Sequence, residues 1–101
     1  MPSIELEVSL GDVRRIEGGH VVVGRANDAT VRLEAKLVSH YHVKLAFRDG
    51  RWRAEDLESK NGTFLNRVRI MKADLDAGDV LRLGDGGPKV RVLAVDPPIP
   101  A

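Results

Sequence analysis

The sequence predicts an all-β domain of the sandwich or barrel class. Apolar and polar residues alternate with a period of two in several short runs, and this alternation is typical of half-buried strands. Gly, Asp and Asn lie between the runs, where they favour tight turns. Residues 29–38 come nearest to a helical pattern, but Thr30, Val31 and Val38 are poor helix formers. Many short strands joined by turns therefore indicate a sandwich or a barrel.

The predicted strands follow one another along the chain. In the first run the apolar side chains share one face, namely Ile4, Leu6, Val8 and Leu10. Asp49-Gly50 lies between two alternating runs, 43–48 and 52–56, and this placement predicts a β-hairpin. The other predicted strands cover residues 13–16, 20–23, 31–33, 63–65, 68–70, 80–83 and 90–95. Proline cannot extend a central strand, so we expect one domain over 1–95 and a proline-rich tail or linker start over 96–101.

Length and composition narrow the class of protein. The 101 residues suit a single domain with a modest core. The net charge of +1 gives no overall field that would attract nucleic acid or a membrane, and three of the four aromatic residues have core positions available. The absence of cysteine excludes disulfides and thiolate zinc sites. No apolar run approaches the ~20 residues of a membrane span, and the N-terminus does not read as a signal peptide. We expect a monomeric, cytoplasmic domain without a cofactor.

Four loop clusters stand out because strand propensity does not explain them. The first is Gly24-Arg25, which follows an apolar run. The others are 39–42 (Ser-His-Tyr-His), 59–63 (Ser-Lys-Asn-Gly-Thr), and 78–79 (Gly-Asp) with Gly84 beyond it. Loops held by a rigid frame of strands are where binding residues usually lie.

These clusters resemble the forkhead-associated (FHA) family. The family pattern is Gly-Arg, then Val-Ser-Arg-x-His, then Ser-x-Asn-Gly-Thr with two apolar residues and Asn-Gly, and last Gly-Asp, four apolar residues and Gly. This chain has, in the same order, Gly24-Arg25, Val38-Ser39-His40-Tyr41-His42, the run from Ser59 to Asn66, and the run from Gly78 to Gly84. The resemblance covers roughly residues 4–95. It implies an eleven-stranded β-sandwich of the SMAD/FHA-like type, with phosphopeptide-binding loops at one end.

The chemistry of the loop residues fits a phosphothreonine ligand. Its phosphate carries about −1.5 to −2 charges and three acceptor oxygens. Arg25 offers a planar fork of donors, and we expect Ser39 to donate through both its hydroxyl and its backbone N–H. Lys60 adds a mobile charge, and the amide of Asn61 has a donor and an acceptor for the peptide main chain. The predicted phosphopeptide-binding residues are Arg25, Ser39, His40, Ser59, Lys60 and Asn61.

Four matching positions are expected to be structural. The resemblance implies that His42 ties two binding loops together without touching the ligand. Gly24 is expected to allow two loops to approach closely, and Gly62 to permit a turn with positive φ. Asn66 is expected to form a turn.

The chain departs from the family pattern in three places. His40 stands where arginine is usual, and a neutral imidazole is a weaker phosphate partner. Thr30 stands where aspartate is common, and Arg67 replaces the glycine after Asn66. Arg67 and Arg69 would favour acidic residues downstream of the phosphothreonine.

The function predicted is a non-enzymatic signalling module that recruits a phosphothreonine-containing protein or peptide. The alternative is a phosphate-independent interaction or dimerisation domain of the same fold, and His40 motivates it. Arg25 could also be a surface arginine paired with Asp28. Ser39 and the histidines could suggest a hydrolase, but the sequence has no Gly-x-Ser-x-Gly motif. His40 and His42 could suggest a metal site, but the sequence has no cysteine and only one further histidine to complete it.

Overall fold

The chain folds as two β-sheets, which confirms the predicted all-β class. The structure is a computed structural model, and it describes residues 1–97. Within that range it has eleven strands and no helix, and therefore no helix long and apolar enough to cross a membrane. The strands are β1 (Ser3–Ser9), β2 (Asp12–Glu17), β3 (His20–Gly24), β4 (Val31–Arg32), β5 (Val43–Arg48), β6 (Arg51–Asp56), β7 (Thr63–Leu65), β8 (Val68–Ile70), β9 (Lys72–Asp74), β10 (Val80–Leu83) and β11 (Lys89–Asp96).

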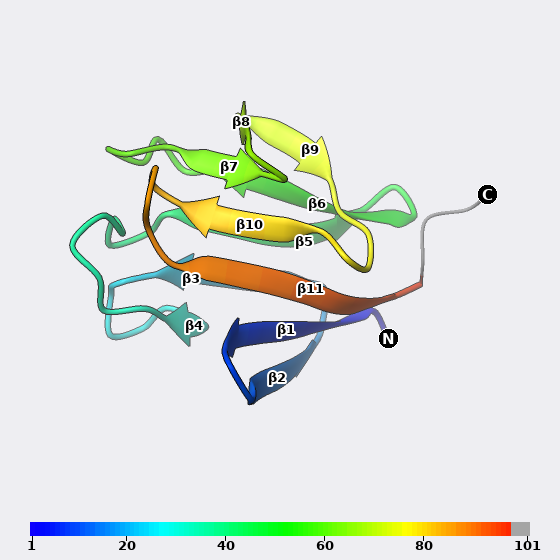
Figure 1. Ribbon diagram of the computed structural model, residues 1–101. Coiled ribbons are helices and arrows are strands. Elements are labelled where there is room, and N and C mark those ends of the chain that lie inside the picture. The colour runs from blue at the N-terminus through cyan, green and yellow to red at the C-terminus, as the bar shows by residue number, and fades with distance from the viewer. Residues whose placement is uncertain (98–101) are drawn as a thin grey trace.

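The two sheets lie face to face as a sandwich (Figure 1). One sheet has six strands in the order β2-β1-β11-β10-β7-β8, and the other has five in the order β4-β3-β5-β6-β9. Neighbouring strands run antiparallel, except for the parallel pair β3 and β4. The Asp49-Gly50 turn joins β5 to β6, as the sequence predicted.

The core fills the space between the sheets. Because side chains alternate across a strand, each sheet contributes the apolar half of its residues to this layer. Trp52 is fully buried there, and its ring packs edge-on against Phe47 with centroids 6.1 Å apart. The indole nitrogen of Trp52 donates to the carbonyl of Asp96 at 3.3 Å, so the end of β11 is held against the other sheet.

Two sequence predictions about strands were wrong. Leu10 is fully exposed, because a register shift between Glu7 and Ser9 ends the regular alternation and Leu10 begins the turn to β2. The strand β9 was missed, because three residues with one small apolar side chain give no alternation to detect. Pairing with β6 defines β9, with Asp74 opposite Arg53.

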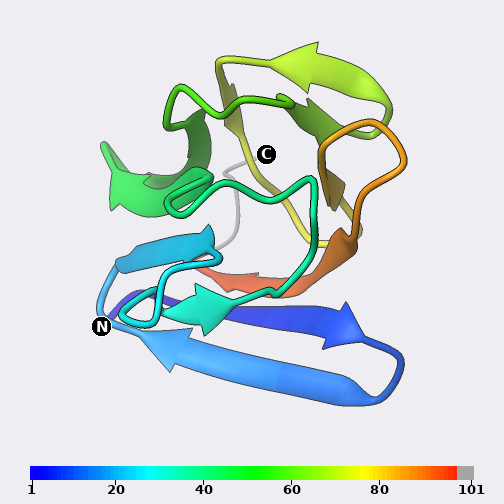
Figure 2. The ribbon, with the colours of Figure 1, turned by 90° about the vertical axis from the view of Figure 1, so that its left-hand side faces the viewer.

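The loops that carry the sequence motifs lie at one end of the sandwich. This end is at the left of Figure 1, and it faces the viewer in Figure 2. The loops are β3–β4 (residues 25–30), β4–β5 (33–42), β6–β7 (57–62) and β10–β11 (84–88). Near the C-terminus of the chain, β11 extends through Asp96. Residues 98–101 of the expected tail lie outside the described residues.

Candidate functional site

Main-chain hydrogen bonds hold the β3–β4 loop against the β4–β5 loop. The N–H of Arg25 donates to the carbonyl of Ser39, and the N–H of Ala26 donates to the carbonyl of His40, both at 3.0 Å. A Cβ on Gly24 would overlap the backbone carbonyl of His40, so only glycine permits this approach. The backbone of Arg25 is therefore fixed beside Ser39, while its side chain is exposed to solvent.

His42 joins the β4–β5 loop to the β6–β7 loop from a fully buried position. Its Nδ1 accepts a hydrogen bond from the Ser39 N–H at 3.1 Å, so Nε2 carries the proton and donates to the Gly62 carbonyl at 2.8 Å. Burial lowers the pKa of His42, against opposing effects of the Gly62 carbonyl and Asp56. The imidazole is thus neutral and has both nitrogens occupied, which leaves neither for a ligand or a metal.

Ser39 has one donor available and not the two that the sequence predicted. Its backbone N–H is committed to His42. Its hydroxyl oxygen accepts from the backbone N–H of Lys60 at 3.1 Å, so the hydroxyl proton remains to be donated. The bond to Lys60 also fixes where that proton can point, because it occupies one side of the oxygen.

Asp56 organises the interior of the β6–β7 loop. Its carboxylate accepts from the Ser59 hydroxyl at 2.5 Å, from the Ser59 N–H at 3.1 Å and from the Thr63 hydroxyl at 2.7 Å. Burial raises the pKa of Asp56, but the hydrogen bonds from Ser59 and Thr63 outweigh it and hold the pKa below its usual value. The Ser59 oxygen also accepts from the Gly62 N–H at 3.0 Å. The hydroxyl of Ser59 is therefore used inside the loop.

Asn61 ties the same loop to the β4–β5 loop. Its Nδ2 donates to the carbonyl of Leu37 at 3.0 Å, and its side-chain oxygen is left as an acceptor. Gly62 adopts the positive φ of 83° expected for it, and its carbonyl accepts from the Gly84 N–H at 2.9 Å as well as from His42. A fourth loop, β10–β11, is thus attached beside Asn61.

Three side chains of the predicted site have no partner among residues 1–97. The guanidinium of Arg25, the ammonium of Lys60 and the imidazole of His40 are exposed and make no hydrogen bond or ion pair there. The suggested pair of Arg25 with Asp28 does not form, because the Asp28 carboxylate accepts from the Tyr41 hydroxyl at 2.8 Å. Arg25 and His40 line the same shallow depression, whereas Lys60 lies outside it on the neighbouring loop.

A family model described as FHA domain matches residues 21–84, which include the β3–β4, β4–β5 and β6–β7 loops. The chain belongs to the FHA family. Several relatives and solved structures resemble it, and all of those reported below carry FHA domains.

Two curated relatives are mycobacterial. FhaB of Mycobacterium tuberculosis, an FHA domain-containing protein, is 38% identical over 65 residues, which cover 63% of this chain and 42% of FhaB. The ABC transporter ATP-binding/permease protein Rv1747 of the same organism is 40% identical over 76 residues, covering 74% of this chain and 9% of the transporter. The chain thus spans less than half the length of either relative.

Solved FHA structures share the whole fold. The FHA-1 domain of Mycobacterium tuberculosis Rv1747 has a TM-score of 0.80 and 34% identity, covering 91% of this chain and 97% of that one. A structure from a study of phosphothreonine-dependent FHA domain interactions has a TM-score of 0.80 and 30% identity, covering 90% and 95%. The FhaA FHA domain, complexed with the intracellular domain of Rv3910, has a TM-score of 0.77 and 29% identity, covering 91% and 99%.

Asn66 lies in the β7–β8 turn of the FHA domain, away from the loop end. Its side chain accepts from the Val80 N–H and donates to Asp79, both at 3.0 Å, so it fastens the turn to β10. Asn66 and Arg67 both have positive φ, at 49° and 74°. These values are typical of a type I′ turn, so Arg67 adopts a conformation that glycine reaches more easily.

The geometry of the FHA loops does not match the chemistry of a hydrolase or a metal site. The Ser39 hydroxyl is hydrogen-bonded to the Lys60 N–H and to neither histidine, so no nucleophile–base pair forms around it. Among residues 1–97 no three His, Cys, Asp or Glu side chains come together as metal ligands. The FHA family is a protein-interaction family and not a known family of enzymes.

Asp56 is the residue of this site that motif reasoning missed. The resemblance drew attention to the serine, asparagine and glycine that follow it. A carboxylate three residues before Ser59 is nonetheless a turn signal, because such a side chain accepts from the backbone N–H a few residues later.

Proposed function

We propose that this FHA domain binds a phosphothreonine of a partner protein or peptide and so recruits that partner, without enzymatic activity. The observation that carries the proposal is the exposed guanidinium of Arg25, which has no ion-pair partner among residues 1–97 and whose backbone N–H is bonded to the carbonyl of Ser39. A phosphate bound there would pair with the guanidinium of Arg25 and accept a hydrogen bond from the Ser39 hydroxyl. Charge-assisted hydrogen bonds of this kind are stronger than neutral ones.

Each loop residue has a separate part in the proposed complex. The Arg25 guanidinium pairs with the phosphate oxygens, and the Ser39 hydroxyl donates its free proton to one of them. Lys60 adds charge from the neighbouring loop, whose backbone is held on the Ser39 oxygen. The side-chain oxygen of Asn61 accepts a main-chain N–H of the peptide, while its amide nitrogen donates to the carbonyl of Leu37.

His40 and Ser59 have different parts from the other four predicted residues. His40 lines the depression beside Arg25, and its imidazole contacts the peptide close to the phosphate. Ser59 acts indirectly, because its hydroxyl bonds to Asp56 and to the Gly62 N–H and so shapes the loop that presents Lys60 and Asn61.

Binding to a degenerate phosphothreonine peptide library tests the proposal. Phosphoserine and unphosphorylated versions of the library serve as ligand controls. We expect measurable binding to the phosphothreonine library alone, and equal binding to the unphosphorylated library would refute the phosphate-dependent function. The variant Arg25→Ala is expected to lose at least about thirtyfold in affinity, because an interfacial charge pair of this type is worth about 2 kcal/mol or more.

The matched control for that variant is Arg48→Ala. Arg48 is an exposed arginine at the end of β5, and no ion pair within residues 1–97 involves it. Both variants are expected to unfold at the same urea concentration as the parent chain. Retained affinity in Arg25→Ala, or an equal loss in Arg48→Ala, would show that the Arg25 guanidinium does not hold the phosphate.

A further inference from the structure

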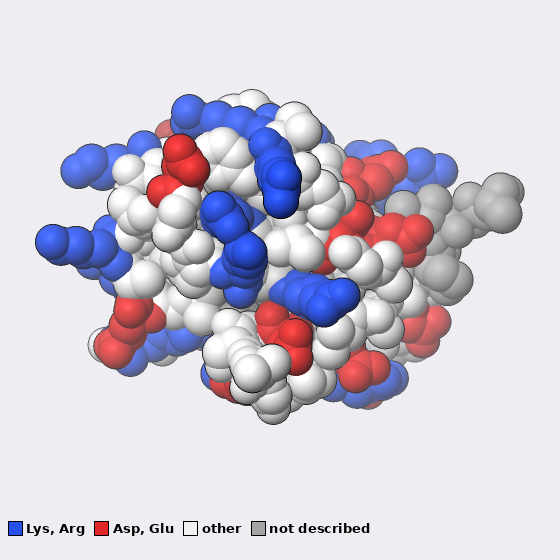
Figure 3. All heavy atoms as spheres, viewed as in Figure 1, with Lys and Arg blue, Asp and Glu red and all other residues white. Residues whose placement is uncertain are grey.

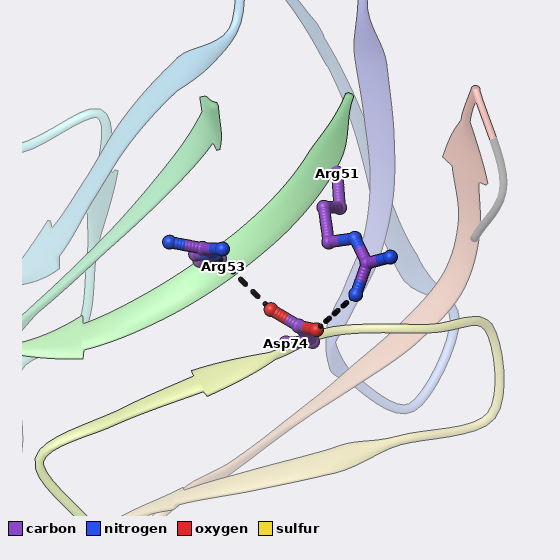
Figure 4. Close-up of polar contacts among 3 residues, drawn as sticks. All are labelled: Arg51, Arg53 and Asp74. Atoms are coloured by element: carbon purple, nitrogen blue, oxygen red, sulfur yellow. Dashed lines mark hydrogen bonds and ion pairs between the residues drawn. The ribbon is translucent and has the colours of Figure 1, made fainter. Parts of the chain in front are cut away.

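Three outward cations of the five-stranded sheet are paired with carboxylates. Arg51 and Arg53 on β6 both contact Asp74 on β9, with Nη1–Oδ2 and Nε–Oδ1 distances of 2.9 and 3.1 Å (Figure 4). On the same sheet, the ammonium of Lys44 lies 3.7 Å from the carboxylate of Glu55. Within residues 1–97 the cations of this sheet without an ion pair are Arg48, at the end of β5, and Lys72, at the start of β9, and they stand apart on two strands that are not neighbours.

The six-stranded sheet has cations that are not neutralised in this way. Arg69, Arg82, Lys89 and Arg91 form no ion pair with any residue of 1–97. The register places Phe64 between Arg69 and Arg82, and Arg82 beside Lys89, so these side chains make one row across β8, β7, β10 and β11. Four strands spaced by about 4.8 Å make a row about 14 Å long. Figure 3 shows Lys and Arg side chains gathered over the middle of this face.

A groove runs along this row, and we call it the basic groove. It is lined by Phe64, Asn66, Arg67, Val80, Arg82, Asp85 and Lys89. The ring of Phe64 is half-buried and faces outward, away from the core. The expectation that three of the four aromatic residues lie in the core was therefore wrong, because Tyr41 is exposed as well. The groove thus combines an apolar floor with cations along its sides.

The basic groove begins close to the loop end of the domain. Asp85, in the β10–β11 loop, is one of its lining residues. Arg69 lies outside the lining, but a Cβ on Gly62 would lie 2.8 Å from its Nε, so this guanidinium reaches back over the β6–β7 loop. Phe64 follows Asn61 by three residues, or about 10 Å of extended chain. A polypeptide held at the loops would reach the groove within roughly three or four residues.

We propose that the basic groove binds an acidic, unphosphorylated segment of a polypeptide, as a second contact for the partner that the loops capture. That the same partner occupies both the loops and the groove rests on the proposed function. The attraction of carboxylates to the groove does not depend on phosphothreonine binding at the loops. Carboxylates pair with Arg82 and Lys89, and an apolar side chain lies on Phe64 and Val80.

A polypeptide fits this surface better than a nucleic acid does. Asp85 lines the groove, and Glu7 on β1 stands opposite Arg91 in the sheet register. A nucleic acid strand carries a charge about every 3.4 Å, so a strand that continued along this face would meet these carboxylates. An acidic peptide segment can place neutral residues against them.

Fluorescence anisotropy with a labelled ten-residue peptide of Glu, Asp, Phe and Gly tests the proposal. We expect Arg82→Glu to weaken binding by roughly fivefold or more, because it replaces an attraction with a repulsion. Lys89→Glu, at an exposed position, is a second variant with the same expected direction. The control Arg48→Glu makes the same charge change on the other sheet and should leave the affinity within about twofold of the parent chain.

Further arms separate this surface from the loop site and from other ligands. Arg25→Ala should bind the acidic peptide as the parent does, even where phosphopeptide binding is lost. Failure of the peptide to bind, or an equal loss in Arg48→Glu, would overturn the proposal. So would tighter binding of a ten-nucleotide single-stranded DNA or of phosphatidylserine vesicles through Arg82 and Lys89, because the groove would then serve a different class of ligand.

Discussion

Replacing His42 with alanine tests whether this one buried ring holds the binding loops together. The imidazole is fully buried and satisfies the Ser39 N–H at 3.1 Å and the Gly62 carbonyl at 2.8 Å. In His42→Ala the Ser39 N–H has lost its partner, and the Gly62 carbonyl keeps only its bond from Gly84. We expect the β4–β5 and β6–β7 loops to separate locally.

The expected loss of stability in His42→Ala follows from the two groups left behind. A buried polar group without its partner costs about 1–3 kcal/mol. The Ser39 N–H bears that cost in full and the Gly62 carbonyl in part, and the space left by the ring removes further packing contacts. We therefore expect the free energy of unfolding to fall by about 3–4 kcal/mol, which is a large share of the 5–15 kcal/mol typical of a domain.

Urea unfolding followed by Trp52 fluorescence measures this loss, because the indole is fully buried in the core. The matched control is His40→Ala, two residues away, where the exposed imidazole has no partner among residues 1–97. The control should change the free energy of unfolding by no more than about 0.5 kcal/mol. If His42→Ala stayed within about 1 kcal/mol of the control, which is the typical net contribution of one hydrogen bond, His42 would not be the tie between the loops.

Three further predictions concern the same end of the domain. The stability of the domain should fall as the pH drops below 6.5, the usual pKa of histidine, because the pKa of His42 is lowered in the folded state and the unfolded chain binds the proton more readily. Thermal melts at stepped pH measure this dependence, and a melting temperature that did not change with pH in the parent chain would contradict it. Gly24→Ala should cost about 2–4 kcal/mol in urea unfolding, since its Cβ overlaps the His40 carbonyl, whereas Gly11→Ala, with open space and φ of 82°, should cost only about 1–2 kcal/mol. Asp56→Asn should lower the free energy of unfolding by about 1–2 kcal/mol and reduce phosphopeptide affinity, because one acceptor of the β6–β7 loop becomes a donor. If urea unfolding were unchanged, the carboxylate would be dispensable for stability.

The longer strands could be predicted from the sequence because packing dictates their pattern. β5 and β6 alternate clearly, and Asp49-Gly50 fixes their register through the turn that it forms. β9 could not be found in this way, since it exists only through its pairing with β6. Leu10 misled the prediction for the opposite reason: the apolar alternation continues by one residue past the point where the backbone leaves the sheet.

The loop residues could be identified from their motifs, but their individual bonds could not. The sequence placed Ser39 at the site and assigned it two free donors. Only the fold shows that His42 takes the backbone N–H and that Lys60 supplies a donor to the hydroxyl oxygen. Such assignments depend on which loops lie side by side. Residues 39 and 60 are neighbours because of the order of the strands in the sheets, and local sequence patterns do not predict that order.

The loop end is held together without ion pairs, and this arrangement keeps its cations available. The ties among the β3–β4, β4–β5 and β6–β7 loops include main-chain bonds, the neutral imidazole of His42, the amide of Asn61 and the Ser39 hydroxyl. The nearby carboxylate of Asp28 is engaged by the Tyr41 hydroxyl, a bond that also raises the pKa of Tyr41. Had the loops been joined by ion pairs, a bound phosphate would first have to displace a carboxylate from Arg25. Because no such pair forms within residues 1–97, the Arg25 guanidinium can bind an anion without first breaking an internal contact.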